Sequence, residues 1–168
     1  ARVELESGEI RHVSELVTGD SVRVSSRQFS EVFMLTHKHM GVVTTMVRVE
    51  AKEHVLELSP GHYIPINGCL IAARAVKVGD VVSLANGKTA KITSTSLVRK
   101  QGLFNPQTLH GNIVVNGVVA STLTDAVHPQ LARLLLAFPR VMYQMGIKEP
   151  FGTWLHMSNS RVASLIPS

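Results

Sequence analysis

The sequence predicts one all-β domain followed by a short helical C-terminal tail, and three observations support this fold class. Short apolar runs rich in β-branched residues fill the first 125 residues, where helical periodicity is nearly absent. Asn-Gly pairs separate several of these runs, and this dipeptide favours the type I′ turn of a β-hairpin. The sequence also repeats itself over a distance of sixty residues. An all-β domain made of two similar halves would explain all three observations.

The expected strands follow one another closely. Around residues 3–5 and again around residues 22–24, valine and leucine alternate with polar residues, as they do in half-buried strands. Four further apolar runs are expected to form strands: 42–47, 55–58, 81–84 and 113–115. Three Asn-Gly pairs lie between apolar runs: Asn67-Gly68, Asn86-Gly87 and Asn116-Gly117. Each pair predicts a type I′ hairpin.

The internal repeat pairs residues 7–22 with residues 67–82 without a gap. Four pairs stay in register: Gly8 with Gly68, Gly19 with Gly79, Asp20 with Asp80, and Val22 with Val82. A second, shorter echo pairs residues 64–68 with residues 113–117. Two copies with so long a period fit neither a solenoid nor a propeller, so the repeat predicts a duplicated half-domain. Two unrelated Gly-Asp turns are the alternative.

The tail is expected to begin with a helix over residues 128–145. Four apolar residues recur there at helical spacing: Leu131, Leu134, Leu135 and Phe138. Pro129 suits the first turn of a helix, and Pro139 is expected to kink or end it. We expect the apolar face to dock on the β domain, with contact to a membrane surface as the alternative.

The rest of the tail is expected to be loop, with three candidate anchors: Phe151, Trp154 and Leu155. The predicted boundaries are therefore residues 1–125 for the β domain and residues 126–168 for the helical and loop extension.

Composition narrows the functional classes. The chain has 168 residues, of which 45% are hydrophobic and 17% charged, and this suits one folded domain and excludes disorder. Its single cysteine, Cys69, excludes an internal disulfide and a Cys-rich zinc module, and we expect it to be structural. The net charge of +5 is compatible with nucleic-acid binding as a function. However, the basic residues are scattered and aromatic residues are too few for stacking platforms, so we expect no nucleic-acid partner.

The clearest candidate site is the Ser-x-x-His pair formed by Ser59 and His62, between two expected strands. A hydroxyl three residues before a histidine can orient the imidazole, and the histidine can protonate a leaving group or polarise an amide. By spacing alone, a plain surface or core histidine is the more common case. His37 and His39 are the closest histidine pair, but no third ligand follows them, so we expect no metal and no cofactor.

Four short motifs occur in a characteristic order: VELESG at 3–8, ELxxGDxV at 15–22, LSxxH at 58–62 and AVKVGD at 75–80. In this order the chain resembles the Hint family, which comprises hedgehog autoprocessing domains and inteins. Two later segments, 102–108 and 111–121, look like the hedgehog type in particular. The resemblance covers roughly residues 1–125 and implies a flat, horseshoe-like fold of two pseudo-symmetric halves. It places the tail where hedgehog proteins have a sterol-recognition region.

The resemblance implies a self-cleaving domain that works by an N-to-S acyl shift. A first cysteine, usually followed by phenylalanine in hedgehog-type members, attacks the preceding peptide carbonyl and forms a thioester. An alcohol (cholesterol in hedgehog), water, or a second side-chain nucleophile then resolves it. The family's threonine and histidine, which orient the amide and protonate the departing nitrogen, match Ser59 and His62. The reaction is a single turnover in cis, and a hedgehog-like protein is secreted or enters the secretory pathway.

The chain departs from the family pattern at three positions. The Cys-Phe pair would lie about five residues before Ala1, so the chain by itself is expected to be inactive. The family's base, an aspartate, is matched by His37, which can accept a proton near neutral pH or be an ordinary strand residue. The second cysteine is matched by Thr122, for which a plain structural role is the more common alternative. By the second echo, Thr108 and His110 are weaker candidates near the site.

We therefore expect an autoprocessing domain that acts on its own upstream domain and exists as a monomer. Its acceptor would be water, a sterol or another alcohol, with hydrolysis or a non-sterol acceptor favoured by His37. A non-catalytic Hint-fold binding module is the first competing interpretation, and a basic nucleic-acid-binding β domain is the second.

Overall fold

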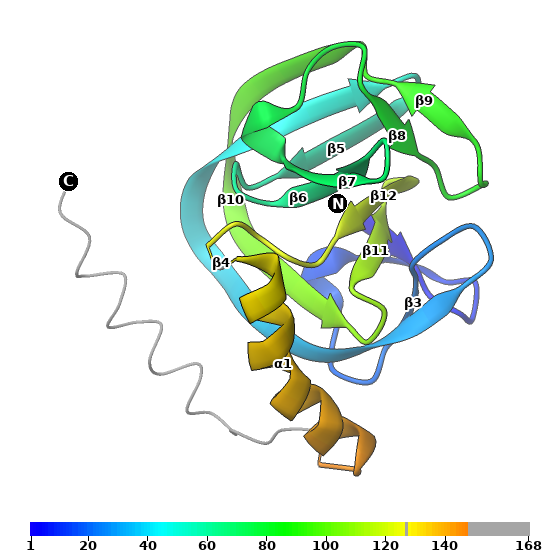
Figure 1. Cartoon of the computed structure of the whole chain (residues 1–168), viewed down its shortest axis with the longest axis vertical. Coiled ribbons are helices and arrows are strands. Elements are labelled where there is room, and N and C mark those ends of the chain that lie inside the picture. The colour runs from blue at the N-terminus through cyan, green and yellow to red at the C-terminus, as the bar shows by residue number, and fades with distance from the viewer. Residues whose placement is uncertain (127, 148–168) are drawn as a thin grey trace, which may run out of the picture.

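The computed structural model describes residues 1–126 and 128–147, and its elements are mostly strands (Figure 1). In chain order they are β1 (Arg2–Glu4), β2 (Ile10–His12), η1 (Val13–Glu15), β3 (Ser21–Arg23), β4 (Phe29–Ala51), β5 (His54–Leu58), β6 (Tyr63–Ile66), β7 (Cys69–Ala72), η2 (Ala73–Ala75), β8 (Val81–Ser83), β9 (Thr89–Lys91), β10 (Ser94–Thr108), β11 (Asn112–Val115), β12 (Val118–Ser121) and α1 (Pro129–Gln144). The predicted all-β class with one C-terminal helix is confirmed.

Two strands are much longer than the apolar runs suggested. β4 has 23 residues and β10 has 15, and they pair antiparallel from Ser94 opposite Glu50 to Thr108 opposite Val32. Figure 1 shows the two ribbons running together along one side of the domain. The sequence indicated only the part of β4 around residues 42–47. The middle of this strand is largely exposed, so it carries no alternation of apolar and polar residues that could mark its full length.

The predicted duplication is visible in the backbone. η1 and η2 are displaced by sixty residues, and so are β3 and β8 and the first residues of β4 and β9. The side chains of Asp20 and Asp80 make the same contact in the two halves. Asp20 accepts a hydrogen bond from the Val17 N–H and Asp80 accepts one from the Lys77 N–H, both at 2.8 Å. The two Gly-Asp turns are therefore equivalent in geometry as well as in sequence.

Two of the three Asn-Gly turns have the predicted geometry. Both residues have positive φ at 67–68 (50° and 80°) and at 116–117 (49° and 82°), as a type I′ turn requires. The prediction is wrong for Asn86-Gly87, where only the glycine has positive φ (80°). Here the Leu84 N–H donates to the Lys88 carbonyl, so the loop has three residues and needs its left-handed residue only at the end.

The Gly-Asp turns give a prediction about stability. Gly79 has a φ of +95°, and a Cβ placed there would meet no atom within 4 Å. The cost of a side chain is therefore purely conformational, and we expect Gly79→Ala to lower the free energy of unfolding by about 1–2 kcal/mol. Gly41→Ala is the matched control, because Gly41 lies in β4 with equally open space but without positive φ. Urea denaturation checks both variants, and equal losses would contradict the explanation.

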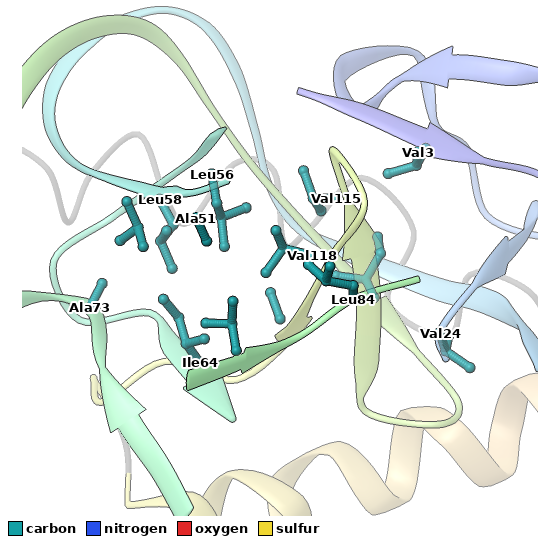
Figure 2. Close-up of a cluster of buried hydrophobic side chains, with 14 of the residues drawn as sticks. Val3, Val24, Ala51, Leu56, Leu58, Ile64, Ala73, Leu84, Val115 and Val118 are labelled. Carbon is teal, nitrogen blue, oxygen red and sulfur yellow. The ribbon is translucent and has the colours of Figure 1, made fainter. Parts of the chain in front are cut away.

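One hydrophobic core joins the two halves. Figure 2 shows Leu56, Leu58, Ile64 and Ala73 pointing toward one another, with Val118 and its neighbours continuing the cluster. Further members come from the N-terminal half: Val3, Leu5, Leu16, Val22, Val24 and Val32. The strand ends that carry the candidate site are therefore anchored in buried apolar packing.

Helix α1 begins at Pro129 as predicted, but it continues through Pro139 rather than ending there. The helix ends instead at Gln144, two residues before Gly146, whose φ of +89° is typical of the residue that follows a helix end. No helix in the described part of the chain is both long and apolar enough to cross a membrane. The three candidate anchors in the tail lie outside the described residues.

The helix docks on the β domain by a different face from the one the sequence suggested. Tyr143 is buried, its hydroxyl donates to a Glu31 carboxylate oxygen, and its ring lies 6.5 Å from the ring of Phe33. Burial and Glu31 together raise the pKa of Tyr143 to about 12. The apolar face that the sequence predicted to dock, the leucine stripe from Leu131 to Phe138, is exposed instead, and the Leu134 side chain is 69% accessible. Tyr143, together with Arg140, whose guanidinium lies 5.6 Å from the centre of the Phe33 ring, thus holds the helix against β4 in place of the leucine stripe.

Candidate functional site

A cavity of about 510 Å³ opens where β4 and β10 meet the turn between β5 and β6. Ser59, His62 and His37, the three leading candidates from the sequence, all line this cavity. The first residue of the chain, Ala1, lies in the same wall. The structure therefore brings residues from three separate segments to one place: the N-terminus, β4 and the turn between β5 and β6.

The turn that carries Ser59 and His62 is fixed at both ends. β5 ends at the buried Leu58, and β6 buries Ile64 completely. Within the turn, the His62 N–H donates to the Ser59 carbonyl at 2.9 Å. The Ser59 hydroxyl is not engaged by any other described residue. It is free to bind a group that enters the cavity.

The His62 ring has one nitrogen committed and one available. Its Nε2 lies 2.7 Å from the Ser121 carbonyl oxygen, which can only accept, so Nε2 carries the hydrogen. No hydrogen bond to Nδ1 is found among the described residues. Burial lowers the pKa of His62, and the Ser121 carbonyl offsets this only in part. At neutral pH the ring is therefore neutral, and its protonated form is a stronger acid than ordinary histidine.

This lowered pKa predicts a pH dependence of stability. In the unfolded chain a histidine has a pKa near 6.5. Below that pH His62 is therefore protonated in the unfolded state but still neutral in the folded state, where its pKa is lower. The contribution of His62 is fully present above about pH 7 and declines as the pH falls, by at most about 1.4 kcal/mol per unit. We expect His62→Asn to flatten the fall in unfolding free energy between pH 7.5 and 5.5 in urea titrations. His12 and His37, whose pKa values are also lowered, supply the remaining slope. Identical slopes in the two proteins would contradict this assignment.

His37 reaches the cavity from β4. It lies opposite Asn105 of β10, next to a shift in the register of the two strands. Burial lowers the pKa of His37, and the neighbouring His39, whose ring centroid is 6.0 Å away, lowers it further. His37 is thus neutral near pH 7 and able to accept a proton. Among the described residues, no group of three or more His, Cys, Asp or Glu side chains converges as a metal site would require.

The three weaker candidates lie outside the cavity lining. Thr122 is buried and donates its hydroxyl to the Gly111 carbonyl at 3.2 Å. Thr108 is also buried, and its hydroxyl bridges the turn by donating to the Asn112 carbonyl at 2.7 Å. His110 is exposed on that same turn. The hydroxyls of Thr122 and Thr108 thus support the β10–β11 turn, although Thr122 directly follows the Ser121 carbonyl that bonds His62.

Two cavity residues were missed by sequence reasoning. Asn105 is buried, and no hydrogen-bond partner for its Oδ1 is found within the described residues. Asp125 lies beside the His62 turn, because its N–H donates to the Gly61 carbonyl at 2.8 Å and Thr124 pairs with His62. Asn105 stood inside a segment that carried the family resemblance, whereas Asp125 served only as a domain boundary. Neither belongs to a local motif that would have indicated a site.

The N-terminal strand is tied down so that the chain enters the domain at the cavity. The Ala1 carbonyl accepts a hydrogen bond from the Val13 N–H at 2.9 Å. The backbone of Arg2 is bonded twice to Asn116, once to its side chain and once to its N–H, both at 2.8 Å. A peptide that precedes Ala1 would therefore start within the cavity wall. Fold and cavity together define a β domain that presents a hydroxyl and an imidazole to its own N-terminal backbone.

Comparison with known proteins shows to which family this β domain belongs. The model of the Hint module matches residues 1–161. The chain therefore belongs to the Hint family, and it is an autoprocessing-type domain. The predicted flat fold of two similar halves is confirmed by this match and by the structural similarities.

The relatives include both hedgehog-type proteins and inteins. Warthog protein 6 of Caenorhabditis elegans is 31% identical over an alignment of 134 residues, and the match covers 71% of this chain and 22% of that protein. Sonic hedgehog protein of Xenopus laevis is 27% identical over an alignment of 139 residues, and the match covers 72% of this chain and 31% of that protein. The chain thus spans less than a third of the length of either relative.

Solved structures show the same fold at low sequence identity. The crystal structure of the gp41-1 intein has a TM-score of 0.61 and 14% identity, and the match covers 71% of this chain and 92% of that one. The solution structure of a bacterial intein-like domain from Clostridium thermocellum gives 0.58 and 12%, covering 71% and 93%.

Proposed function

We propose that this domain cleaves the peptide bond that joins it to an upstream domain, through a thioester formed by an N-to-S acyl shift. The observation that carries the proposal is that Ser59, His62 and Ala1 line one cavity, because this sets the incoming backbone beside a hydroxyl and an imidazole. The nucleophile is a cysteine about five residues before Ala1. Five extended residues span up to about 17 Å, which lets the scissile bond lie in the cavity.

In the first step the cysteine sulfur attacks the carbonyl carbon of the residue before it. A C–S bond forms, the C–N bond breaks, and the nitrogen leaves as an amine with the proton that the thiol has lost. The neutral His62 ring takes the thiol proton on Nδ1, because Nε2 is held by the Ser121 carbonyl, and then delivers it to the departing nitrogen. The Ser59 hydroxyl, in the same turn, binds and orients the scissile amide. The lowered pKa of His62 suits this role, since it makes the imidazolium a more effective donor.

In the second step an acceptor hydroxyl attacks the thioester carbon and the thiolate leaves. His37 accepts the proton of that hydroxyl from the β4 side of the cavity. Its half-buried, neutral imidazole supports water or a small alcohol as acceptor, and a sterol is the alternative. The fragment released is an acid or an ester accordingly.

The proposal is tested with the full-length precursor, in which the native upstream sequence precedes Ala1. Dithiothreitol should accelerate release of the upstream domain by attacking the thioester, and mass spectrometry of the released fragment, with and without sterol, identifies the acceptor. A precursor without a cysteine near the expected position, or one that dithiothreitol leaves intact, would contradict self-cleavage. That result would favour a non-catalytic Hint-fold binding module.

The setting of the reaction follows from the hedgehog-type relatives and from α1. We propose a secretory-pathway protein in which the domain is monomeric and the exposed stripe of α1 meets a lipid surface. Of the two charged residues within α1, Arg140 lies over Phe33 of β4 and Arg133 is exposed, and an exposed basic residue beside an apolar stripe favours anionic membranes. Sedimentation with phosphatidylserine vesicles should bring the protein down, whereas no binding would contradict the lipid contact.

A further inference from the structure

Asp125 is a carboxylate that the fold holds in the cavity wall next to His62. Its backbone N–H bonds the Gly61 carbonyl at 2.8 Å, and the preceding residue, Thr124, forms a β-bridge with His62. Its side chain is about one quarter exposed, in the wall that His62 and Ser59 also line. The backbone contacts therefore hold residue 125 next to the His62 turn, in the wall of the same cavity.

The absence of a side chain at Gly61 makes room for this carboxylate. A Cβ at Gly61 would overlap the carboxyl end of the Asp125 side chain, which would then have to move from its place. Gly61 does not have positive φ, so its backbone conformation alone would accept alanine. The glycine between Pro60 and His62 is thus explained by the space that Asp125 needs.

The partners of Asp125 leave part of its carboxylate available. Oδ2 forms an ion pair with the largely exposed guanidinium of Arg74, while Oδ1 lies over Gly61. The other carboxylate of the cavity, Glu57, is matched by two cations instead. Glu57 lies 3.1 Å from Lys100 Nζ and 3.6 Å from Arg48. Asp125 is thus paired with one cation and Glu57 with two, so Asp125 has the greater capacity for a further positive charge.

We propose that Asp125 binds the α-ammonium group that the acyl shift creates, and this inference rests on the proposed function. When the C–N bond breaks, the nitrogen keeps its amide hydrogen and receives the thiol proton by way of His62 Nδ1, which gives a neutral amine. A further proton from water then makes it an ammonium, so a positive charge ends on a nitrogen beside His62. A carboxylate at that place stabilises the ammonium and opposes the return of a neutral amine to the thioester.

The experiment compares variants of the full-length precursor in dithiothreitol, which captures the thioester and so reports the first step. We expect Asp125→Asn to lower the rate of this cleavage at least ~10-fold, the size of a charge-assisted hydrogen bond. Gly61→Ala should lower it similarly without any change of charge, because it displaces the carboxylate. Arg74→Gln should not lower the rate, since it removes only the competing cation. Glu57→Gln, in the same cavity, is the matched control and should cleave like the wild type.

The outcomes separate this inference from the proposed function. A wild-type precursor that dithiothreitol does not cleave would overturn both. Wild-type cleavage with an unchanged Asp125→Asn rate would overturn the ammonium site alone. Equal losses in Asp125→Asn and Arg74→Gln would assign Asp125 to a structural ion pair and also overturn it. Unfolding midpoints of each variant show whether a lost rate comes from a lost fold.

Discussion

His62→Ala will lower the rate of self-cleavage of the full-length precursor by at least ~100-fold, the usual contribution of a positioned acid or base. The departing amide nitrogen is a poor leaving group until it is protonated. Within the described residues, His62 is the imidazole whose Nε2 is fixed by a backbone carbonyl, at 2.7 Å, and whose other nitrogen is available beside the Ser59 hydroxyl. Gel electrophoresis of precursor and product over time, with dithiothreitol present, measures the rate.

His110→Ala is the matched control for this variant. His110 is exposed on the β10–β11 turn and does not line the cavity, so its removal should leave the rate unchanged. Unaltered cleavage in His62→Ala would show that the turn between β5 and β6 is not the site. A large loss in His110→Ala would move the site to the other end of β10.

Leu16→Ala will lower the free energy of unfolding by about 2–5 kcal/mol, a large share of the stability of a domain this size. Leu16 is fully buried in the cluster that joins the two halves, directly after η1. Truncation removes its transfer energy and leaves a void that the rigid strands around it cannot close. Urea denaturation measures the loss. Val17→Ala, one residue later at a 51% exposed side chain, should change stability by no more than about 0.5 kcal/mol.

The sequence was most informative where structure depends on short-range geometry. Asp20 and Asp80 cap equivalent turns, and each accepts its hydrogen bond from a backbone N–H only three residues away. Because this contact is local, the sixty-residue repeat could be recognised from the sequence alone. The turn that presents Ser59 and His62 is local in the same sense, and these two residues and His37 do line one cavity.

Features that depend on distant packing could not be read in this way. Asp125 lies beside His62 only because two strands bring residues 61 and 125 together, and nothing in its local sequence indicates that neighbour. The docking face of α1 was missed for a similar reason. The leucine stripe had the expected helical period, but the residue that contacts the β domain is Tyr143. Its partners, Glu31 and Phe33, precede it by more than a hundred residues. The periodicity of apolar residues shows which residues share a face of the helix, but it does not show which face packs against the rest of the domain.

The contact between Arg2 and Asn116 has a consequence for the order of events during synthesis. The N-terminal strand is made first, but it cannot be fastened at the cavity until residue 116 has left the ribosome. The carbonyl that holds His62 follows at Ser121, and Asp125 follows that. At roughly 5–20 residues per second, synthesis of residues 1–125 takes about 6–25 s. In the proposed reaction, an upstream domain would therefore have that interval to fold while still attached, because cleavage could begin only after residue 125 has been made.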